Sequence, residues 1–229
     1  MTFNSPRTWI RAFAGASLAL ALAVPVAAQE QYGGFAKQGG FVAVTFMPAF
    51  TFDGEFFDGL TGYKDVDGPE LVFLPKLDKQ PLIRGLLGFR GRNASLELSY
   101  ERSQHDGTFG DETMNATFQA VNVDGRYFFA SGSRIQPHVL AGGSFPWLRV
   151  KDGSILEADL GDARFRGYGV NTEAGVTVYP HRQFGIGVGY SYRVIWFDRA
   201  TGVDGKVKEL RPRFRETSGN LALTGTFVF

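Results

Sequence analysis

The residues best suited to catalysis lie in the short stretch "SQHDG". Ser103 and His105 are two positions apart, so on a strand their side chains would share one face, and Asp106 follows directly. A serine, a histidine base and an acidic group are the components of nucleophilic hydrolysis. The other two of the three histidines have simpler interpretations, His181 as a turn residue and His138 as an inward-facing residue near Arg126. We interpret "SQHDG" as part of an external polar loop and predict no catalytic residues.

A second candidate for chemistry is the acidic stretch "KDVDGPE". It brings Asp65, Asp67 and Glu70 close together in sequence, but it lacks the further spaced ligand and the glycine position of a calcium-binding EF-hand loop. The chain has no cysteine, which excludes disulfides and thiolate metal sites. We expect a solvated acidic loop, no metal, no cofactor and no enzymatic activity.

Composition and the N-terminus indicate the compartment. The formal net charge is only +1, unlike the basic excess of nucleic-acid binders, whereas glycine (30) and phenylalanine (22) are abundant. Arg7 and Arg11 precede the apolar run "AFAGASLALALAV", and the small residues of "VAA" at 26–28 follow. This pattern predicts a signal peptide over 1–28 and a mature domain over 29–229. The alternative is a membrane anchor, although the run is short for a bilayer span of about 20 residues.

The mature chain alternates between apolar and small or polar residues with period two, which is typical of strands. In "QFGIGVGYSYRVIWFD", for example, an aromatic and aliphatic face alternates with a glycine, serine and arginine face. The eight predicted strands lie near residues 39–52, 80–90, 94–104, 113–129, 134–150, 163–179, 183–198 and 214–229. They are longer than the typical strand of about 5–6 residues and closer to those that cross a bilayer.

The connections between these strands alternate in length. Tight turns follow the second, fourth and sixth strands, at residues 91–93, 131–133 and 180–182, and long polar connections follow the others, the first over about 53–79. All-β barrels of the outer membrane have short turns at one end and long loops at the other. The sequence therefore predicts an eight-stranded antiparallel up-and-down transmembrane β-barrel.

The signal peptide, the alternating connections and segments such as "IQPHVLAGG", "FGIGVGYSYR" and "LALTGTFVF" resemble the small eight-stranded outer-membrane barrels of the outer-membrane-protein A and X type. The resemblance implies a monomer in the outer membrane of a Gram-negative cell. It also implies that the last strand carries a signal for the barrel-assembly machinery, formed by Leu221, Leu223, Phe227 and Phe229. The peptidoglycan-binding domain of some relatives is not expected, because the sequence ends at the last strand.

On this fold the non-apolar face of each strand points into the lumen. The predicted lumen charges are Arg84, Arg90, Glu97, Glu101, Asp124, Arg126, Glu173, Arg193 and Glu216. An eight-stranded barrel encloses only enough space for side chains, and buried charges are costly unless they are paired. We expect Arg84 to pair with Glu101 and Arg193 with Glu216, so that the lumen is a polar plug and not a wide pore.

The long connections differ in charge. Residues 53–79 are mainly acidic, and the predicted loop over 199–215 is mainly basic, with Lys206, Lys208, Arg211 and Arg213 in "KVKELRPRFR". Strands eight and one are neighbours in a closed barrel, so the two loops should adjoin. The basic loop is predicted to contact lipopolysaccharide phosphates, and the alternatives are a solvated loop or a contact with the acidic loop.

These features favour a structural or surface-interaction role for the protein, with outer-membrane lipid, lipopolysaccharide and the assembly machinery as partners and no nucleic acid. The alternatives are a narrow gated channel and, less favoured, a lipid-modifying outer-membrane enzyme. A soluble ligand-binding barrel agrees less well with the outward Tyr, Trp and Phe residues on nearly every strand.

Overall fold

A computed structural model of the chain describes residues 34–52, 63–64, 71–72, 76–109, 112–151, 163–201, 205 and 207–229. The predicted signal peptide over 1–28, the acidic residues of "KDVDGPE" and Lys206 lie outside these ranges. Among the described residues, no helix has the length and apolar character needed to cross a membrane.

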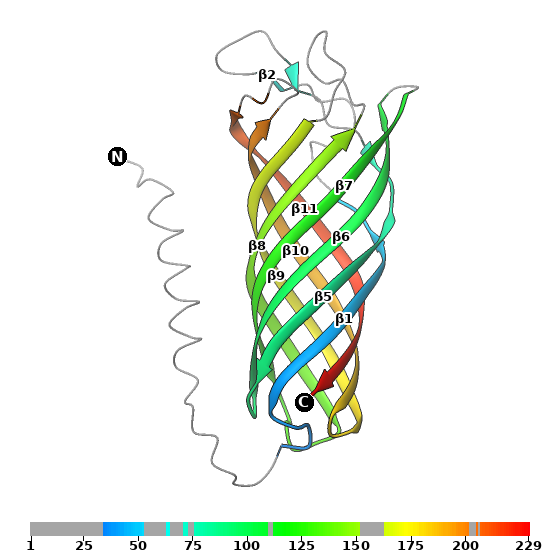
Figure 1. The fold of residues 1–229 in the computed structure, drawn as a ribbon, viewed down its shortest axis with the longest axis vertical. Coiled ribbons are helices and arrows are strands. Elements are labelled where there is room, and N and C mark those ends of the chain that lie inside the picture. Colours follow the sequence, from blue (N-terminus) through cyan, green and yellow to red (C-terminus); the bar gives the residue numbers. More distant parts are fainter. Residues whose placement is uncertain are drawn as a thin grey trace, which may run out of the picture.

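Eight long antiparallel strands form a tall barrel whose strands tilt around the long axis (Figure 1). They are β1 (Gly39–Phe50), β5 (Gln80–Arg90), β6 (Ala94–Phe109), β7 (Glu112–Phe128), β8 (Ile135–Lys151), β9 (Ala163–His181), β10 (Phe184–Thr201) and β11 (Val207–Val228). The short strands β2 (Tyr63–Lys64), β3 (Leu71–Val72) and β4 (Lys76–Leu77) lie between β1 and β5 in sequence. The predicted eight-stranded up-and-down barrel is confirmed.

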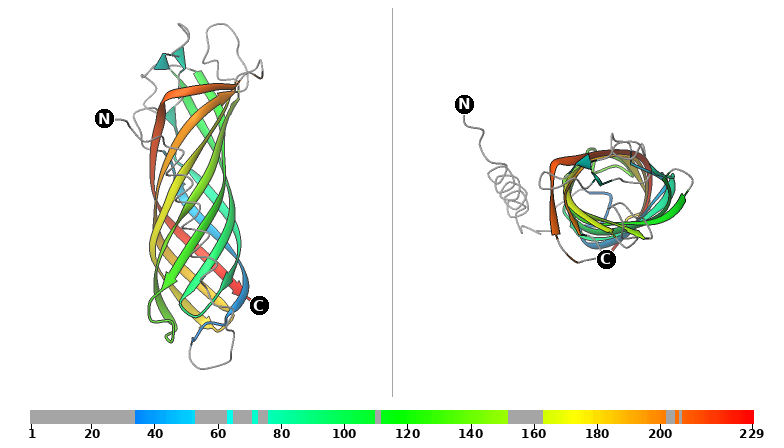
Figure 2. Two further views of the ribbon diagram at one scale, coloured as in Figure 1. Left: turned by 90° about the vertical axis from the view of Figure 1, so that its left-hand side faces the viewer. Right: turned by 90° about the horizontal axis from the view of Figure 1, so that it is seen from above.

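The first and last long strands close the barrel. β1 pairs with β5 on one side and with β11 on the other, from Phe41 opposite Val228 to Phe46 opposite Leu223. The backbone N–H of Phe229 donates to the Gly40 carbonyl at 2.9 Å. Gly39 adopts a φ of 141°, and a Cβ there would lie 2.6 Å from the Phe229 carbonyl oxygen, so this crowded position favours glycine. Viewed along its axis, the barrel is a closed ring (Figure 2).

The strands extend further from the short turns than predicted. The expected long loop after the third strand is wrong, because β6 continues to Phe109, which lies opposite Glu112 at the start of β7. The predicted basic loop over 199–215 is also wrong in part. Its residues from 207 belong to β11, and Arg199 of β10 lies opposite Glu209 after a bulge that follows Phe197. Polar residues that resemble loop sequence are therefore strand residues.

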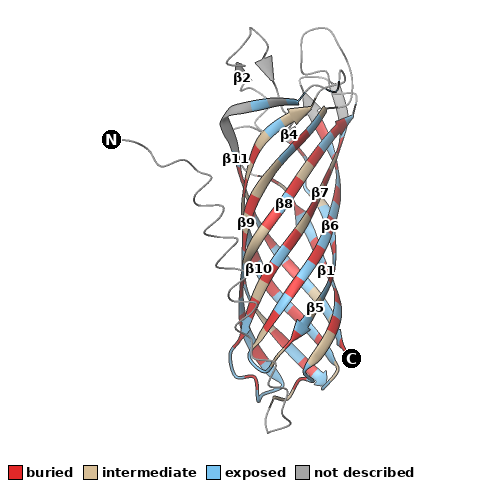
Figure 3. Ribbon diagram, turned by 60° about the vertical axis from the view of Figure 1, so that its left-hand side comes forward, coloured by how far each residue is buried: buried red, intermediate tan, exposed pale blue. Residues whose placement is uncertain are grey.

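Buried and exposed residues alternate along the strands, with a change of phase at the bulges of β1 and β10 (Figure 3). The chemistry of the two faces is nevertheless exchanged along the barrel. We define the lower half as the part between the short turns and the level of Glu101, Ser144 and Arg193, and the upper half as the part beyond it. Along β8, His138 and Ser144 face inward in the lower half, whereas Leu148 and Val150 face inward in the upper half. The change divides the barrel into two halves whose inward faces differ in chemistry.

The exterior of the lower half is an aliphatic band between two aromatic rows. Its exposed residues include Val44, Leu87, Leu98, Val139 and Val188. Aromatic side chains flank the band near the short turns (Phe89, Tyr127, Phe129, Phe184, Phe227, Phe229) and at the upper boundary (Tyr100, Phe145, Trp147, Tyr168, Trp196). An outward apolar band between aromatic girdles is the exterior of a barrel that spans a bilayer.

Candidate functional site

The lumen is the candidate site, and its lowest layer is built around Arg90 at the end of β5. The Arg90 guanidinium lies 3.6 Å from the ring centre of Phe128 and donates a hydrogen bond of 2.7 Å to the Tyr179 hydroxyl. Its other terminal nitrogen donates to Gln136, which in turn donates 2.9 Å hydrogen bonds to the carbonyls of Ser131 and Ser133 in the β7–β8 turn. These contacts fix the arginine above the short turns.

The next layer is a charged network around Arg126 of β7. Its guanidinium donates to both carboxylate oxygens of Glu97 at 2.8 and 3.1 Å, and to Glu173 at 3.0 Å. The Nε2 atom of His138 lies 2.6 Å from Arg126 and 3.2 Å from Glu173. All four side chains are buried. The arginine is therefore held by two carboxylates from opposite sides, as a buried charge requires.

The upper layer of the polar lumen centres on Glu101 of β6, which accepts from two arginines. Arg84 lies opposite Glu101 in the β5–β6 register, and its Nε donates to Glu101 at 2.9 Å. Arg193 of β10 reaches Glu101 across the lumen and donates through both terminal nitrogens. The predicted pairing of Arg193 with Glu216 is wrong. Arg193 lies opposite Ser218 on β11, whereas Glu216 lies two residues higher, opposite Ile195.

Small residues make room for these networks. A Cβ at Gly185 would lie 2.7 Å from the Tyr179 ring, and one at Gly189 would lie 3.2 Å from the Glu173 carboxylate. The glycine face of "GIGVGYS" is therefore the space into which long side chains of β9 extend. Asp124 also faces the lumen, where it accepts a hydrogen bond of 3.2 Å from Asn171.

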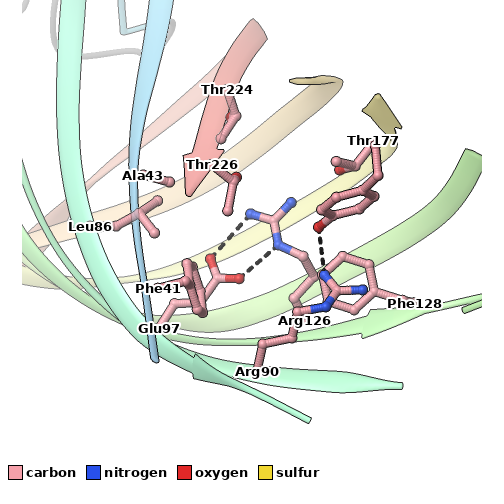
Figure 4. A pocket seen from close by; sticks show the side chains of 11 residues that line it. Phe41, Ala43, Leu86, Arg90, Glu97, Arg126, Phe128, Thr177, Thr224 and Thr226 are labelled. Carbon is pink, nitrogen blue, oxygen red and sulfur yellow. Dashed lines mark hydrogen bonds and ion pairs between the residues drawn. The ribbon is translucent and has the colours of Figure 1, made fainter. Parts of the chain in front are cut away.

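A small cavity lies between the two lower layers (Figure 4). Arg126 and Glu97 face each other across one part of it, and Arg90 donates to Tyr179 in another part. Apolar side chains and threonines complete the wall: Phe41, Ala43, Leu86, Phe128, Thr177, Thr224 and Thr226.

Residues 34–38, which we call the N-terminal strap, cross the lower mouth. The Phe35 N–H donates to the Ser131 carbonyl in the β7–β8 turn, and the Lys37 N–H donates to the Arg182 carbonyl in the β9–β10 turn, at 2.9 and 2.8 Å. The chain then enters β1, which lies on the side of the ring away from the β7–β8 turn. Ala36 is buried. The strap therefore covers the mouth below the Arg90 layer.

The lumen of the upper half is mainly apolar, although buried Ser103, His105 and Glu216 also lie in it, and sequence reasoning missed this apolar filling. Buried side chains of eight elements pack there: Met47, Phe50, Phe52, Leu77, Leu82, Ala116, Phe118, Ala120, Leu148, Val150, Phe165, Ile195, Phe197 and Ala222. The rings of Phe50 and Phe118 lie 5.2 Å apart, and the Arg193 guanidinium lies 5.8 Å from the Phe50 ring centre. This apolar plug therefore rests directly on the Glu101 layer. The sequence does contain a sign of this apolar plug. In the upper part of β8 the residues in the inward positions are Leu148 and Val150, and those in the outward positions are Arg149 and Lys151.

Ser103 and His105 both face inward from β6, not outward from a loop, which corrects the predicted position of His105. The Ser103 hydroxyl donates to the Pro81 carbonyl at 2.9 Å, and Nδ1 of His105 lies 2.9 Å from the Asp78 carbonyl. The imidazole packs against the rings of Phe50 and Phe52. Both side chains are thus engaged with backbone carbonyls, and the described contacts do not join them as a nucleophile and its base.

The remaining predicted residues that the structure describes lie on the strand β11 or, for Phe229, directly after it. Leu221, Leu223, Phe227 and Phe229 all face outward at the lower end of the barrel, and their role as an assembly signal stays a prediction. Lys208, Arg211 and Arg213 lie within β11 and not in a loop, and their contact with lipopolysaccharide stays a prediction. In the described part of the chain, no group of three or more His, Asp or Glu side chains is arranged to hold a metal ion.

Comparisons with known proteins agree with the fold. No protein-family model and no curated relative matches the sequence. Among solved structures, Neisserial surface protein A superposes with a TM-score of 0.54 at 16% identity, covering 83% of this chain and 97% of that one. The outer membrane protein AlkL, solved in DMPC lipid bilayers, gives 0.52 at 14% identity over 90% of this chain and 97% of that one. The chain therefore has the fold of the small eight-stranded outer-membrane β-barrels.

Proposed function

We propose that the protein is an integral outer-membrane barrel with a closed lumen, whose role is structural and whose upper half presents a rigid surface outside the membrane. The single observation that carries the proposal is the filling of the lumen at successive levels. The strap, the Arg90 layer, the Arg126 network, the Glu101 layer and the apolar plug follow one another from the lower mouth upward.

The upper half supports the surface role. Its strands stay paired up to Phe109 and Glu112 in β6 and β7 and up to Thr201 and Val207 in β10 and β11. A barrel needed only to span the bilayer could end near the upper aromatic row. The additional strand length, packed around an apolar core, supports a role in contacts at the cell surface.

Planar-bilayer recording of the refolded protein tests the closed lumen. We expect no stable conductance above that of the protein-free bilayer, because ions would have to cross both buried charge networks and the apolar plug. A matched pair of variants calibrates the assay: Arg193→Ala with Phe118→Ala widens the lumen, whereas Tyr190→Ala with Val188→Ala removes similar volume from the outer face. Discrete conductance steps of the unaltered protein would favour the narrow gated channel instead.

Two further measurements address location and enzymatic activity. Outer-membrane fractionation with a gel of boiled and unboiled samples should give a heat-modifiable band in the outer-membrane fraction. The mass spectrum of lipid A should be the same in cells with and without the protein, because Ser103 and His105 each bond to a different backbone carbonyl. A change in acylation or phosphorylation would favour the lipid-modifying enzyme.

A further inference from the structure

Basic side chains gather on the exterior of β8 to β11 at the boundary between the two halves. Six exposed basic residues lie there: Arg149, Lys151, Arg164, Arg166, Arg199 and Arg215. The acidic residues described in the same region are Asp198, 4.0 Å from Arg199, and Glu209, opposite Arg199 in register. We call Arg149, Arg164, Arg166 and Arg199 the arginine belt.

The sheet register places like charges directly beside one another in this belt. Arg149 of β8 lies opposite Arg164 of β9, and Arg166 of β9 lies opposite Arg199 of β10. Directly opposed residues of an antiparallel pair have Cβ atoms about 4.5–5.5 Å apart, and like charges in such positions are destabilising. A polyvalent anion lying across the three strands would be attracted to all four guanidinium groups at once.

The depth of the belt identifies the anion. Trp147 is the register partner of Arg166, and two residues further down β9 the ring of Tyr168 stacks on that of Trp196 at 5.6 Å. Aromatic rings of membrane proteins lie at the level of the lipid headgroups. The guanidinium groups therefore lie at headgroup depth or just above it, and arginine binds phosphate through two parallel hydrogen bonds.

Of the described residues on β5 to β7 and just before β5, the exposed basic ones above the short turns are Lys79 and Arg102. Arg102 lies opposite Ile83 on β5 and Gln119 on β7, so no second arginine faces it in the register. Within the described residues, directly opposed arginines therefore occur on β8, β9 and β10.

We propose that the arginine belt binds the phosphate groups of an outer-leaflet glycolipid of the lipid A type. The inference rests on the proposed function, because it requires the barrel to span the outer membrane. It moves the predicted lipopolysaccharide contact from Lys206, Lys208, Arg211 and Arg213 to the wall formed by β8, β9 and β10. The headgroup would lie across the belt, and its acyl chains would pack below on the aromatic row.

Tryptophan fluorescence can report on this site, because Trp147 and Trp196 lie directly below the belt. The full chain with Trp9→Phe is refolded into vesicles of brominated phosphatidylcholine, whose bromines quench both tryptophans. Unbrominated lipid A, added at increasing mole fraction, should displace brominated lipid and restore the emission. Unbrominated phosphatidylcholine at the same mole fraction should restore it much less.

The belt variant carries Arg149→Gln, Arg164→Gln, Arg166→Gln and Arg199→Gln. A control variant with the same loss of charge carries Lys37→Gln, Arg92→Gln, Arg102→Gln and Arg182→Gln, all exposed outside the belt. Each basic residue near an anionic surface changes affinity by roughly fivefold, so the belt variant should need at least about fivefold more lipid A for half recovery. The control should titrate like the parent.

Equal titrations of the belt variant and the parent would overturn the inference. If the belt variant does not refold, the double variant Arg164→Gln with Arg166→Gln gives the same comparison with half the charge loss. A chain without a heat-modifiable band and without quenching by brominated lipid has not inserted, which contradicts the proposed function itself. Insertion without a preference for lipid A would contradict only the proposal that the arginine belt binds lipid A.

Discussion

The lower and upper halves of the barrel are built from the same strands with opposite chemistry. In the lower half, Val188 and Tyr190 of β10 face outward and Arg193 faces inward, whereas in the upper half Phe197 faces inward and Arg199 outward. One apolar face must always be covered, by lipid below and by the packed lumen above. The comparison shows that the surroundings of the barrel, and not its fold, decide which face is apolar.

The two lumens are stable for different physical reasons. The lower lumen contains buried charges that are tolerated because each arginine meets a carboxylate or another polar group with good geometry. The upper lumen is a hydrocarbon core whose stability scales with packing. Changes that remove a charge should therefore be most harmful below, and changes that remove volume should be most harmful above.

The largest expected effect comes from removing the shared carboxylate of the lower half. Glu101→Gln leaves both Arg84 and Arg193 buried without their carboxylate partner and should cost about 3–5 kcal/mol. The free energy of unfolding is measured by urea titration in lipid vesicles. Adding Arg84→Met and Arg193→Met should recover much of the loss, because the uncompensated charges are then gone. A loss of stability that these additions do not reduce would show that Glu101 acts through something other than its charge.

The exterior of the two halves can be compared with one type of substitution. Val188→Arg places a cation in the aliphatic band and should cost about 2–4 kcal/mol near the middle of the bilayer. Val207→Arg, on the exterior of the upper half, should change the free energy of unfolding by less than about 0.5 kcal/mol, as surface substitutions commonly do. Similar costs in the same vesicles would mean that the boundary between the halves is in the wrong place.

The sequence allowed the lower half to be predicted better than the upper half. Arg84 and Glu101 were paired correctly because the tight turn "GRN" gives β5 and β6 a common origin for counting. β10 and β11 are joined through their upper ends, so counting from their lower ends misplaced Arg193 relative to Glu216. The contact of Arg193 with Glu101 crosses the lumen between strands that are not neighbours, and alternation within one strand carries no information about it.

The apolar plug was missed because one rule was applied along the full length of each strand. The assumption that the apolar face meets lipid holds for Val188 but fails at Leu148 and Phe165, where the exterior is in water. Polar sequences around His105 and Arg213 resembled loops, although they belong to the extended strands β6 and β11.

A smaller effect on the free energy of unfolding should distinguish the lumen of the lower half from that of the upper half. Phe118→Ala empties a fully buried position in the apolar plug, whereas Phe41→Ala enlarges a cavity that already exists beside Arg90 and Glu97. A Phe→Ala change in a packed core costs about 3–5 kcal/mol, and the cost falls where the site relaxes or admits water. We therefore expect Phe118→Ala to be more destabilising by about 1 kcal/mol or more in the same urea titration. A larger loss for Phe41→Ala would indicate that the lower lumen is the more tightly packed region.

The smallest effect on stability is expected at the closing strand of the lower half. Removing Phe229 eliminates one backbone hydrogen bond to Gly40 and a ring that is 60% exposed, so the folded barrel should lose about 1 kcal/mol or less. The yield in the outer membrane of cells should nevertheless fall strongly, because the resemblance to small outer-membrane barrels implies that the assembly machinery reads this residue. For the parent and the variant, the yield of barrel in the outer membrane of cells is compared with the yield of refolding in detergent. Phe227→Ala, which changes another outward residue of the same strand, is measured alongside. Equal yields of parent and variant in cells would leave Phe229 with its structural role only, as the residue that completes the pairing of β11 with β1.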